Sequence, residues 1–363
     1  MIRVRHGVMV VGLAMSCKMA ILKMLAASLT QLAEERKPNA LKTVMQIINP
    51  KSVTLGQLYG KADEVSHDWS DGVLAVYFRN MSLMDVELNK WLIFDGPVDT
   101  LWIESMNTVL DDSRKLCLMS GEIIHMAPNM NCISVPADLA EASPATVSRN
   151  GVIYMQPHLV GWRPLFDSWK NTLPDCFYAE GNEAHLKNID ELIDVVVQPC
   201  IDYIRRDCQE VTPTDDQSLV QALLRLWRSL LKIFDDPNYL QNLEKKKAIG
   251  IVDATFLFSA IWSVCITIGS DQRRKFDMHM KKVCDGGYEG VKKFANKKLL
   301  PSIFDKGLIY DYVYFPEEDQ WKPWLDLTDR DQVDNFPRDA VSQDIVVTTV
   351  DTIRYSFIQE HCI

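Results

Sequence analysis

The residues from Val8 to Met19 read V-M-V-V-G-L-A-M-S-C-K-M, and this stretch decides the fold class. Its first four residues are apolar, mostly β-branched and followed by Gly12, which is typical of a fully buried strand in a parallel sheet. A helical pattern then runs from Lys18 to Glu35. The residues expected on the buried face of that helix are Ile21, Leu22, Leu25 and Leu29. A buried strand that turns directly into a helix predicts an α/β domain.

Four more apolar runs have the character of buried strands. They are Val44–Ile48, Trp91–Phe94, Met130–Val135 and Val152–Met155. Strands that alternate with helices predict βαβ units and a parallel sheet sandwiched by helices. Two inserts interrupt the pattern. One is a β-hairpin in which Lys115–Leu118 and Ile123–Met126 flank M-S-G-E, and the other is an ordered loop over Thr54–Asp71 that precedes a helix.

From Trp162 onward the pattern of apolar residues becomes helical. The clearest stripe consists of Leu219, Leu223, Trp227, Leu230 and Phe234. A stripe at this spacing predicts packing into a core. The uncharged run Ala254–Ser270 is shorter than the ~20 residues that cross a bilayer, so it predicts a core helix and no membrane span.

These changes of pattern divide the chain into parts. Residues 1–160 are expected to form the α/β domain, and residues 161–286 a smaller helical domain. Residues 287–344 are rich in Pro, Asp and aromatic residues and show no clean helical period. We therefore expect a mixed connecting segment with short strands there.

Composition excludes several classes of function. The net charge of -10 argues against non-specific nucleic-acid binding, which needs a basic surface to displace counterions. The nine cysteines include no C-x-x-C pair, which disfavours a zinc site or a disulfide framework and favours a reducing compartment. The start of the chain mimics a secretory signal, but Lys18 and Lys23 follow at once and no small-x-small cleavage site ends the apolar run.

The turn from Gly12 to Met19 has the spacing of G-x-x-x-x-G-K-[ST], the loop that cradles phosphates. That loop uses glycines so that backbone N–H groups can wrap the phosphates, Lys for the β/γ oxygens and a hydroxyl for Mg²⁺. Lys18 is present, but Cys17 replaces the second glycine and Met19 replaces the hydroxyl. Cys17 must adopt a backbone geometry that glycine reaches more easily. Taken alone, the match favours an ordinary strand–helix turn.

The strand Trp91–Phe94 ends at Asp95, which is the arrangement in which a carboxylate holds Mg²⁺ through water. The next residue is Gly96, where most ATPases of this kind have the Glu that activates the attacking water. The alternative is a turn residue, because Asp-Gly-Pro is also good turn chemistry. The order and spacing relative to Lys18 favour a role for Asp95 at a nucleotide site.

Three longer motifs carry a resemblance. They are N-P-K-S-V-T-L-G-Q-L-Y-G over Asn49–Gly60, W-L-I-F-D-G-P-V-D-T-L-W-I-E-S-M-N-T-V-L-D-D over Trp91–Asp112, and S-P-A-T-V-S-R over Ser143–Arg149. Together with Trp162-Arg-Pro, Phe256–Gly269 and Asp351–Tyr355, they closely resemble the second AAA+ module of dynein heavy chains. The resemblance covers about Arg5 to Phe357.

The resemblance implies a fold, a site and a set of partners. Residues 1–160 and 161–286 are the large and small AAA+ subdomains, and residues 345–363 begin the next module. By this resemblance the module would hold ATP or ADP, if at all, without turning it over, with Gly12, Cys17, Lys18, Met19 and Asp95 around the nucleotide and Asp95 toward Mg²⁺. The partners are the other modules and the linker of the heavy chain, intermediate and light chains, and, indirectly, the microtubule. Nucleic acid and membrane are not expected partners.

The resemblance also implies a location, and the chain departs from the family pattern at two places. The place is the cytoplasm and its cytoskeleton, and Val4-Arg-His-Gly7 resembles axonemal (ciliary) dyneins. Dyneins usually have Gly-Lys-Thr at Cys17–Met19, and often Phe-Glu-Val at Ser134–Pro136. Both departures lie around the nucleotide. We therefore expect weak binding with little magnesium dependence and negligible turnover.

Arg149 stands directly before the last predicted strand, where AAA+ proteins place an arginine finger. Its guanidinium stays charged and can contact phosphate with two nitrogens. In the family the matching residue reaches the nucleotide of the preceding module, so its catalytic role is in trans. The alternatives are a surface arginine or a helix C-cap.

Three functions compete at this stage. The first is a ring element of the motor that supports the neighbouring ATPase site and contacts the linker. In dyneins the two inserts face the linker, so we expect Lys115–Met126 and Thr54–Asp71 to expose an apolar patch. The second is an inactive truncated isoform or pseudogene-like product. The third, an independent ATPase, is disfavoured because Gly96 supplies no catalytic base.

Overall fold

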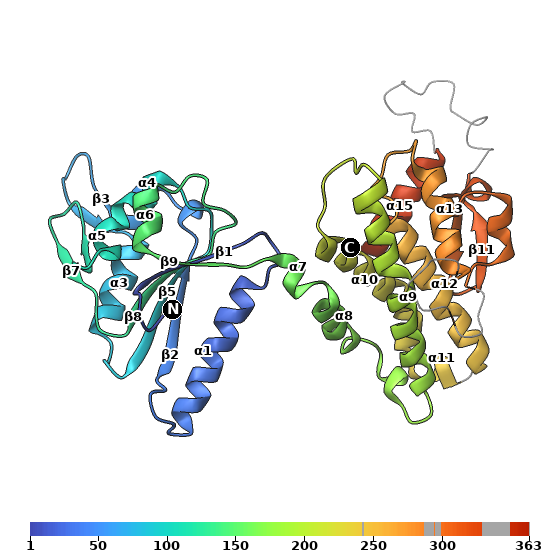
Figure 1. Cartoon of the computed structure of the whole chain (residues 1–363), viewed down its shortest axis with the longest axis horizontal. Coiled ribbons are helices and arrows are strands. Elements are labelled where there is room, and N and C mark those ends of the chain that lie inside the picture. The colour runs from blue at the N-terminus through green and yellow to red at the C-terminus, as the bar shows by residue number, and fades with distance from the viewer. Residues whose placement is uncertain (242, 287–293, 295–298, 329–348, 363) are drawn as a thin grey trace. The chain divides into compact units, whose positions relative to one another are not determined.

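Five parallel strands form the central sheet of residues 1–160 in the computed structural model, in the order β2-β5-β8-β1-β9 (Figure 1). The strands are β1 (Gly7–Val11), β2 (Lys42–Ile48), β5 (Leu88–Phe94), β8 (Met130–Ser134) and β9 (Gly151–Tyr154). All five predicted strands are confirmed. The structure describes residues 1–241, 243–286, 294, 299–328 and 349–362.

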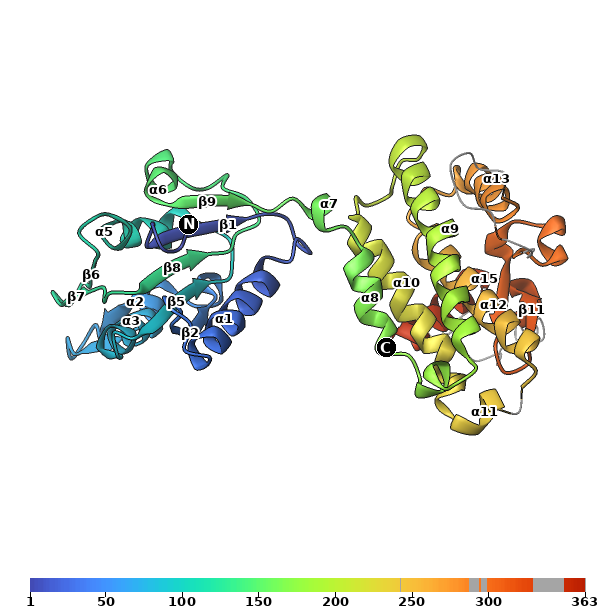
Figure 2. The ribbon, with the colours of Figure 1, turned by 60° about the horizontal axis from the view of Figure 1, so that its bottom comes forward.

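The sheet has a separate core on each face. On one face, Leu22 and Ala26 of helix α1 (Lys18–Glu34) pack in a cluster with Val8 and Trp91 from the strands. The opposite face packs in a larger cluster with helix α3 (Val73–Leu83), whose Phe78 is fully buried. Burying each large apolar side chain contributes about 1.5–3 kcal/mol, so the two clusters hold the helices against the sheet. The predicted parallel sheet sandwiched by helices is confirmed (Figure 2).

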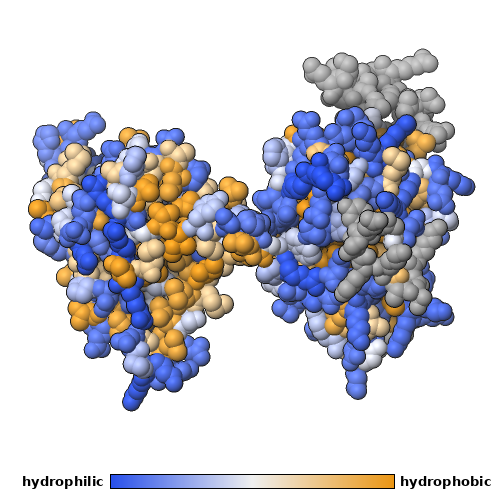
Figure 3. All heavy atoms as spheres, in the orientation of Figure 1, coloured by the Kyte–Doolittle hydropathy of each residue, from blue (hydrophilic) through white to orange (hydrophobic). Residues whose placement is uncertain are grey.

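The predicted buried face of α1 is partly wrong. Ile21 and Leu25 are 46% and 40% exposed, because the side of α1 that contacts the sheet is a narrow stripe that includes Leu22 and Ala26. Met24 is 69% exposed. Apolar side chains therefore remain on the outer surface of α1, and Figure 3 shows apolar side chains where α1 lies in Figure 1.

The insert over Thr54–Asp71 is not the loop that was predicted. It contains helix α2 (Leu55–Tyr59), closed by a capping box between Thr54 and Gln57, and an antiparallel hairpin of β3 (Gly60–Ala62) and β4 (Trp69–Asp71). The second insert is the expected hairpin, with β6 (Lys115–Cys117) paired to β7 (Ile123–His125).

The prediction that both inserts expose an apolar patch is wrong. Leu58 and Leu116 are fully buried, and Leu118 and Ile124 are 6% and 7% exposed. All four belong to the larger core cluster of the sheet, because the two inserts close that core at its edge. The large apolar residues of the two inserts that remain exposed are Leu55, Val65, Met119 and Ile123.

Short helices complete residues 1–160. They are η1 (Pro50–Ser52), α4 (Thr100–Ile103), η2 (Glu104–Met106), α5 (Asn107–Leu110), α6 (Pro144–Arg149) and α7 (Pro157–Val160). Residues 161–363 form a second compact unit. Its helices are α8 (Arg163–Lys170), η3 (Asp175–Tyr178), α9 (Glu183–Asp207), α10 (Asp216–Leu230), η4 (Leu231–Asp235), α11 (Pro237–Gln241), α12 (Lys245–Ser263) and α13 (Arg273–Cys284).

One continuous core holds the second unit together. The predicted stripe on α10 is confirmed, since Leu219, Leu223, Trp227, Leu230 and Phe234 are all at most 3% exposed. The Trp227 ring stacks on Trp169 with centroids 5.0 Å apart, and its indole Nε1 donates to Thr255 of α12. The predicted core helix is confirmed as the second half of α12, although it ends at Ser263. Among the described residues, no helix combines the length and apolar character that crossing a membrane requires.

The chain after α13 packs into the same core as the helices. It contains η5 (Ser302–Lys306), η6 (Ile309–Asp311), the antiparallel pair β10 (Tyr312–Phe315) and β11 (Gln320–Pro323), η7 (Trp324–Leu327) and α15 (Val350–Cys362). Trp324 is fully buried, and its ring centroid lies 5.5 Å from that of Phe357 on α15. Much of the segment expected to connect, over residues 287–344, lies outside the described residues.

Candidate functional site

The strand order brings the candidate nucleotide residues to one edge of the sheet. Gly12 follows β1, Asp95 follows β5, and β8 lies between these two strands. Ligands of parallel α/β sheets bind outside the carboxyl ends of the strands. The backbone N–H of Gly12 donates to the Pro136 carbonyl oxygen at 3.3 Å, which ties the loop to the chain after β8. The structure thus places Gly12, Lys18 and Asp95 at one edge.

Cys17 occupies the left-handed backbone region, with φ 60° and ψ 19°, as the residue that precedes α1. This region favours glycine because a Cβ crowds the neighbouring backbone there. Met15 of the same turn also has a positive φ, 63°. The expectation that Cys17 must adopt a glycine-like geometry is confirmed. At Gly12 a Cβ would lie 2.3 Å from the Met155 carbonyl oxygen, so this position accepts only glycine without movement.

The ammonium group of Lys18 turns back into its own loop. It donates to the carbonyl oxygens of Gly12 and Leu13, the second at 2.9 Å. Burial lowers the pKa of Lys18, and the nearby negative charge of Asp95 opposes that shift. The carbonyl oxygens of the loop therefore engage the Lys18 ammonium group that would otherwise contact a bound phosphate.

At the end of β5, the Asn49 side chain stands where a general base would need space. Asp95 is half-buried, and its backbone N–H donates to the Ile48 carbonyl oxygen at 2.9 Å. A Cβ at Gly96 would lie 2.8 Å from Oδ1 of Asn49, which accepts from the N–H of Lys51. The Asn49 amide thus occupies the space beside Gly96, and a Glu there would have to displace it.

The residues at this edge fit a magnesium nucleotide poorly. Met19 offers no oxygen to Mg²⁺, and Lys18 is engaged by the loop. Within the described part of the chain, no group of three or more His, Cys, Asp or Glu side chains is placed to hold a metal ion. Asp95 remains as a single carboxylate, which could contact Mg²⁺ only through water.

Arg149 lies at the opposite edge of the same sheet. It is the last residue of α6, and β9 begins two residues later at Gly151. Gly151 is level with Val8 and Tyr154 with Val11, so Arg149 lies at the amino ends of the strands. At ~3.3 Å per residue, the length of β9 separates it from the Lys18 loop. Arg149 therefore cannot reach a phosphate on the loop of its own module.

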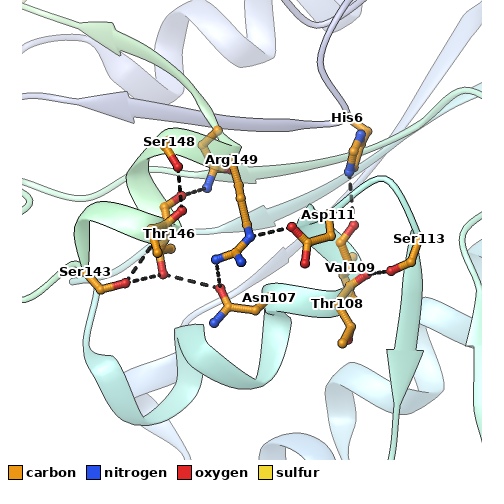
Figure 4. A network of polar contacts seen from close by, with 12 residues as sticks. His6, Asn107, Thr108, Val109, Asp111, Ser113, Ser143, Thr146, Ser148 and Arg149 are labelled. Atoms are coloured by element: carbon orange, nitrogen blue, oxygen red, sulfur yellow. Dashed lines mark hydrogen bonds and ion pairs between the residues drawn. The ribbon is translucent and has the colours of Figure 1, made fainter.

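The guanidinium of Arg149 is held by helix α5 and the residue after it (Figure 4). Nε forms a hydrogen-bonded ion pair with Asp111, and Nη1 donates to Oδ1 of Asn107 at 3.4 Å. The C-cap of α6 is Asn150. The sequence interpretation did not single out Asp111 and Asn107, although both stand in the quoted motif Trp91–Asp112.

A parallel sheet with a phosphate-loop-type turn between β1 and α1, followed by a helical unit, defines an AAA+ module. Residues 189–326 match the dynein heavy chain AAA lid domain. The chain belongs to the dynein heavy chain family, as the resemblance of its motifs predicted.

Individual relatives agree with this assignment. The chain is 40% identical to dynein axonemal heavy chain 3 of Mus musculus over 98% of its own length and 9% of that protein. It is also 40% identical to dynein axonemal heavy chain 12 of Rattus norvegicus, over 100% of the chain and 12% of that protein. Dynein axonemal heavy chain 2 of Homo sapiens is 32% identical over 98% of the chain and 7% of that protein. The chain spans about a tenth of the length of the first two relatives.

Proposed function

We propose that the chain is a ring module of an axonemal dynein heavy chain that binds nucleotide weakly, does not hydrolyse it, and supports the ATPase site of the preceding module. The motifs Asn49–Gly60 and Trp91–Asp112 favour the second position in the ring. The names of the relatives favour the axoneme. The role of the whole motor, ATP-driven movement along microtubules, is part of this proposal.

One observation carries the proposal. The candidate arginine finger and the altered nucleotide-binding residues lie at opposite edges of one sheet. Arg149 is ion-paired at the amino edge. At the carboxyl edge, Lys18 is bound to its own loop and Gly96 is packed against Asn49. An arginine finger serves a neighbour's nucleotide, whereas hydrolysis at the module's own site needs the groups that are missing. This distribution fits a module that acts on its neighbour.

The surface suits contact with other parts of a heavy chain. The outer side of α1 exposes Ile21, Met24 and Leu25, and exposed apolar surface of this kind commonly marks a protein contact. A contact with the linker is part of the proposal, and Met119 and Ile123 are the apolar residues that the β6–β7 hairpin leaves exposed for it, at 93% and 55%. Intermediate and light chains and the microtubule would be partners of the whole motor, in the cytoskeleton of the cilium.

Fluorescent ATP and ADP titrations of the chain, with and without Mg²⁺, test the nucleotide part of the proposal. We expect weak affinity that changes little when Mg²⁺ is removed, and a steady-state turnover far below ~1 s⁻¹. Lys18→Ala should weaken the remaining affinity, whereas Lys23→Ala, on an exposed position of the same helix, should not. Turnover at ~1 s⁻¹ or faster would refute the assignment of a non-hydrolysing module.

A further inference from the structure

Two of the three guanidinium nitrogens of Arg149 are engaged, on opposite edges of the group. Nε forms a hydrogen-bonded ion pair with Asp111, and Nη1 donates to Asn107 (Figure 4). Within the part of the chain that the structure describes, Nη2 has no hydrogen-bond or ion-pair partner. The side chain of Arg149 keeps 30% of its surface exposed. Asp111 and Asn107 therefore hold the guanidinium at two nitrogens, which leaves Nη2 to contact an anion.

The groups that hold Arg149 are themselves anchored. Oδ1 of Asn107 also accepts from the hydroxyl of Thr146, at 3.3 Å, and Thr146 is fully buried. The Thr146 hydroxyl contacts that of Ser143 at 2.9 Å. Asn107, the first residue of α5, thus accepts hydrogen bonds from two residues of α6, Thr146 and Arg149.

The backbone around Asp111 is fixed as well. Its N–H donates to the Asn107 carbonyl oxygen at 2.9 Å, which closes α5. Val109 is fully buried, and its carbonyl oxygen is hydrogen-bonded to Nε2 of His6 at 3.0 Å. The Asp111 side chain is 44% exposed, but the backbone that carries it is fixed. Asp111 therefore presents its carboxylate to Arg149 from a fixed point of the backbone.

We propose that Asp111 is the positioning residue of the Arg149 finger, with Asn107 as its second support. Asp111 orients the guanidinium so that the Nη2 side faces a phosphate of the preceding module. This proposal rests on the proposed function, because it gives Arg149 its role in trans. Arginine is worth more than a point charge only when its planar fork is oriented, and catalytic groups lose large factors in rate when they are displaced by about 1 Å.

Steady-state ATPase measurements on a full-length heavy chain that carries these residues test the proposal. Asp111→Ala should lower kcat by ~10-fold or more with little change in KM, because nucleotide binding does not need the finger. Asp111→Glu should restore part of the loss. Asp112→Ala is the matched control, since Asp112 is the adjacent, exposed carboxylate, and it should leave kcat unchanged.

The double variant Asp111→Ala/Arg149→Ala gives the sharpest readout. If Asp111 acts only through Arg149, the double variant should be no slower than Arg149→Ala alone, because groups that act as a unit are not additive. Additive losses, a parental kcat in Asp111→Ala, or a faster Asp111→Ala enzyme would each overturn the positioning role. A parental kcat in Arg149→Ala would instead overturn the proposed function itself. Urea unfolding of each variant chain shows whether a loss of rate reflects a loss of fold.

Discussion

The ammonium group of Lys18 donates a hydrogen bond to the carbonyl oxygen of Leu13, 2.9 Å from Nζ, inside the loop that joins β1 to α1. In a working phosphate loop the backbone N–H groups face the ligand and the lysine reaches for its β/γ oxygens. Here the lysine satisfies the loop's own carbonyls. Any anion that binds must first separate Lys18 from them, and the affinity falls by that cost.

Rebuilding the loop should restore magnesium-dependent binding. Cys17→Gly relieves the left-handed backbone at φ 60°, and Met19→Thr adds the hydroxyl that Mg²⁺ needs. We expect the double variant to bind MgATP at least ~10-fold more tightly, a gain of about 1.4 kcal/mol, and to lose that gain when Mg²⁺ is removed. Fluorescent nucleotide titration measures both.

The control for the rebuilt loop is Met24→Thr, which places the same hydroxyl on an exposed position of α1, 69% accessible. It should bind nucleotide like the parent chain. An unchanged affinity in the Cys17→Gly/Met19→Thr variant would mean that other features of this edge prevent binding.

Arg149→Ala in a full-length heavy chain should slow ATP turnover at the preceding module by ~10³-fold or more. Nucleotide binding there should remain largely intact, because the finger acts on charge that develops during hydrolysis. Arg149→Lys should rescue little, since an ammonium cannot keep the contacts to both Asp111 and Asn107. ATPase rate and microtubule gliding velocity, measured beside the parent, report the effect.

Ser148→Ala is the matched control for Arg149. Ser148 is the exposed preceding residue of α6, and its hydroxyl donates within the helix, to the Ala145 carbonyl oxygen at 2.9 Å. It should turn over ATP like the parent. A parental rate in Arg149→Ala would leave Arg149 as a structural residue.

Trp227→Ala should destabilise the helical unit by about 3–5 kcal/mol. Trp227 is fully buried, packs between Trp169 and Phe256, and donates to Thr255 Oγ1 at 3.2 Å. Removal leaves a cavity and takes away the indole donor to Thr255 Oγ1, whose own hydrogen bond to the Ile251 carbonyl oxygen remains. Calorimetry of the full chain should show the transition of residues 161–363 at a lower temperature. Arg225→Ala, on the exposed side of the same helix, should shift it little; equal shifts would contradict the assigned core.

Stability of the helical unit should fall as the pH drops below about 6.5. Burial lowers the pKa of His279 from its ordinary value of 6.5, against a smaller opposing effect of the hydrogen bond to the Pro199 carbonyl oxygen. Burial also lowers the pKa of His185. Between pH 6.5 and the lowered pKa values, the unfolded chain binds more protons than the folded one, so acid favours unfolding.

Urea unfolding at pH 7.5 and pH 5.5 measures this dependence. His279→Gln should reduce the loss of stability between the two values, and His185→Gln/His279→Gln should reduce it further. A pH dependence that is the same in the parent and in both variants would show that other groups control it.

The fold could be predicted from the sequence where a run of apolar residues fits only one kind of element. Buried strands such as Trp91–Phe94 were found because both faces of the sheet are covered, which makes every residue apolar. The outer side of α1 was misjudged because apolar Ile21 and Leu25 also suit a surface that another protein covers. Leu58 and Leu116 were misjudged because sequence position does not reveal that an insert folds back onto the core.

Only the part of the candidate site that is local in sequence could be predicted. The loop around Lys18 is local in sequence, so its spacing suggested a phosphate loop, but only the longer motifs favoured that interpretation over an ordinary strand–helix turn. The pair of Arg149 and Asp111 joins residues 38 positions apart. It depends on how α5 and α6 meet at the end of the sheet, which no local pattern encodes. Asp111 stood inside a recognised motif, and that was its only signal.

The placement of Arg149 and Lys18 at opposite ends of the strands has an evolutionary consequence. Under the proposed function, substitutions at Cys17 and Met19 fall at a site whose hydrolysis the motor does not use, which leaves these two positions free to vary. Selection on Arg149, Asp111 and Asn107 comes instead from the neighbour's reaction. Two sets of residues in one small sheet are thus free to evolve at different rates, and the slower set records the activity of a different part of the heavy chain.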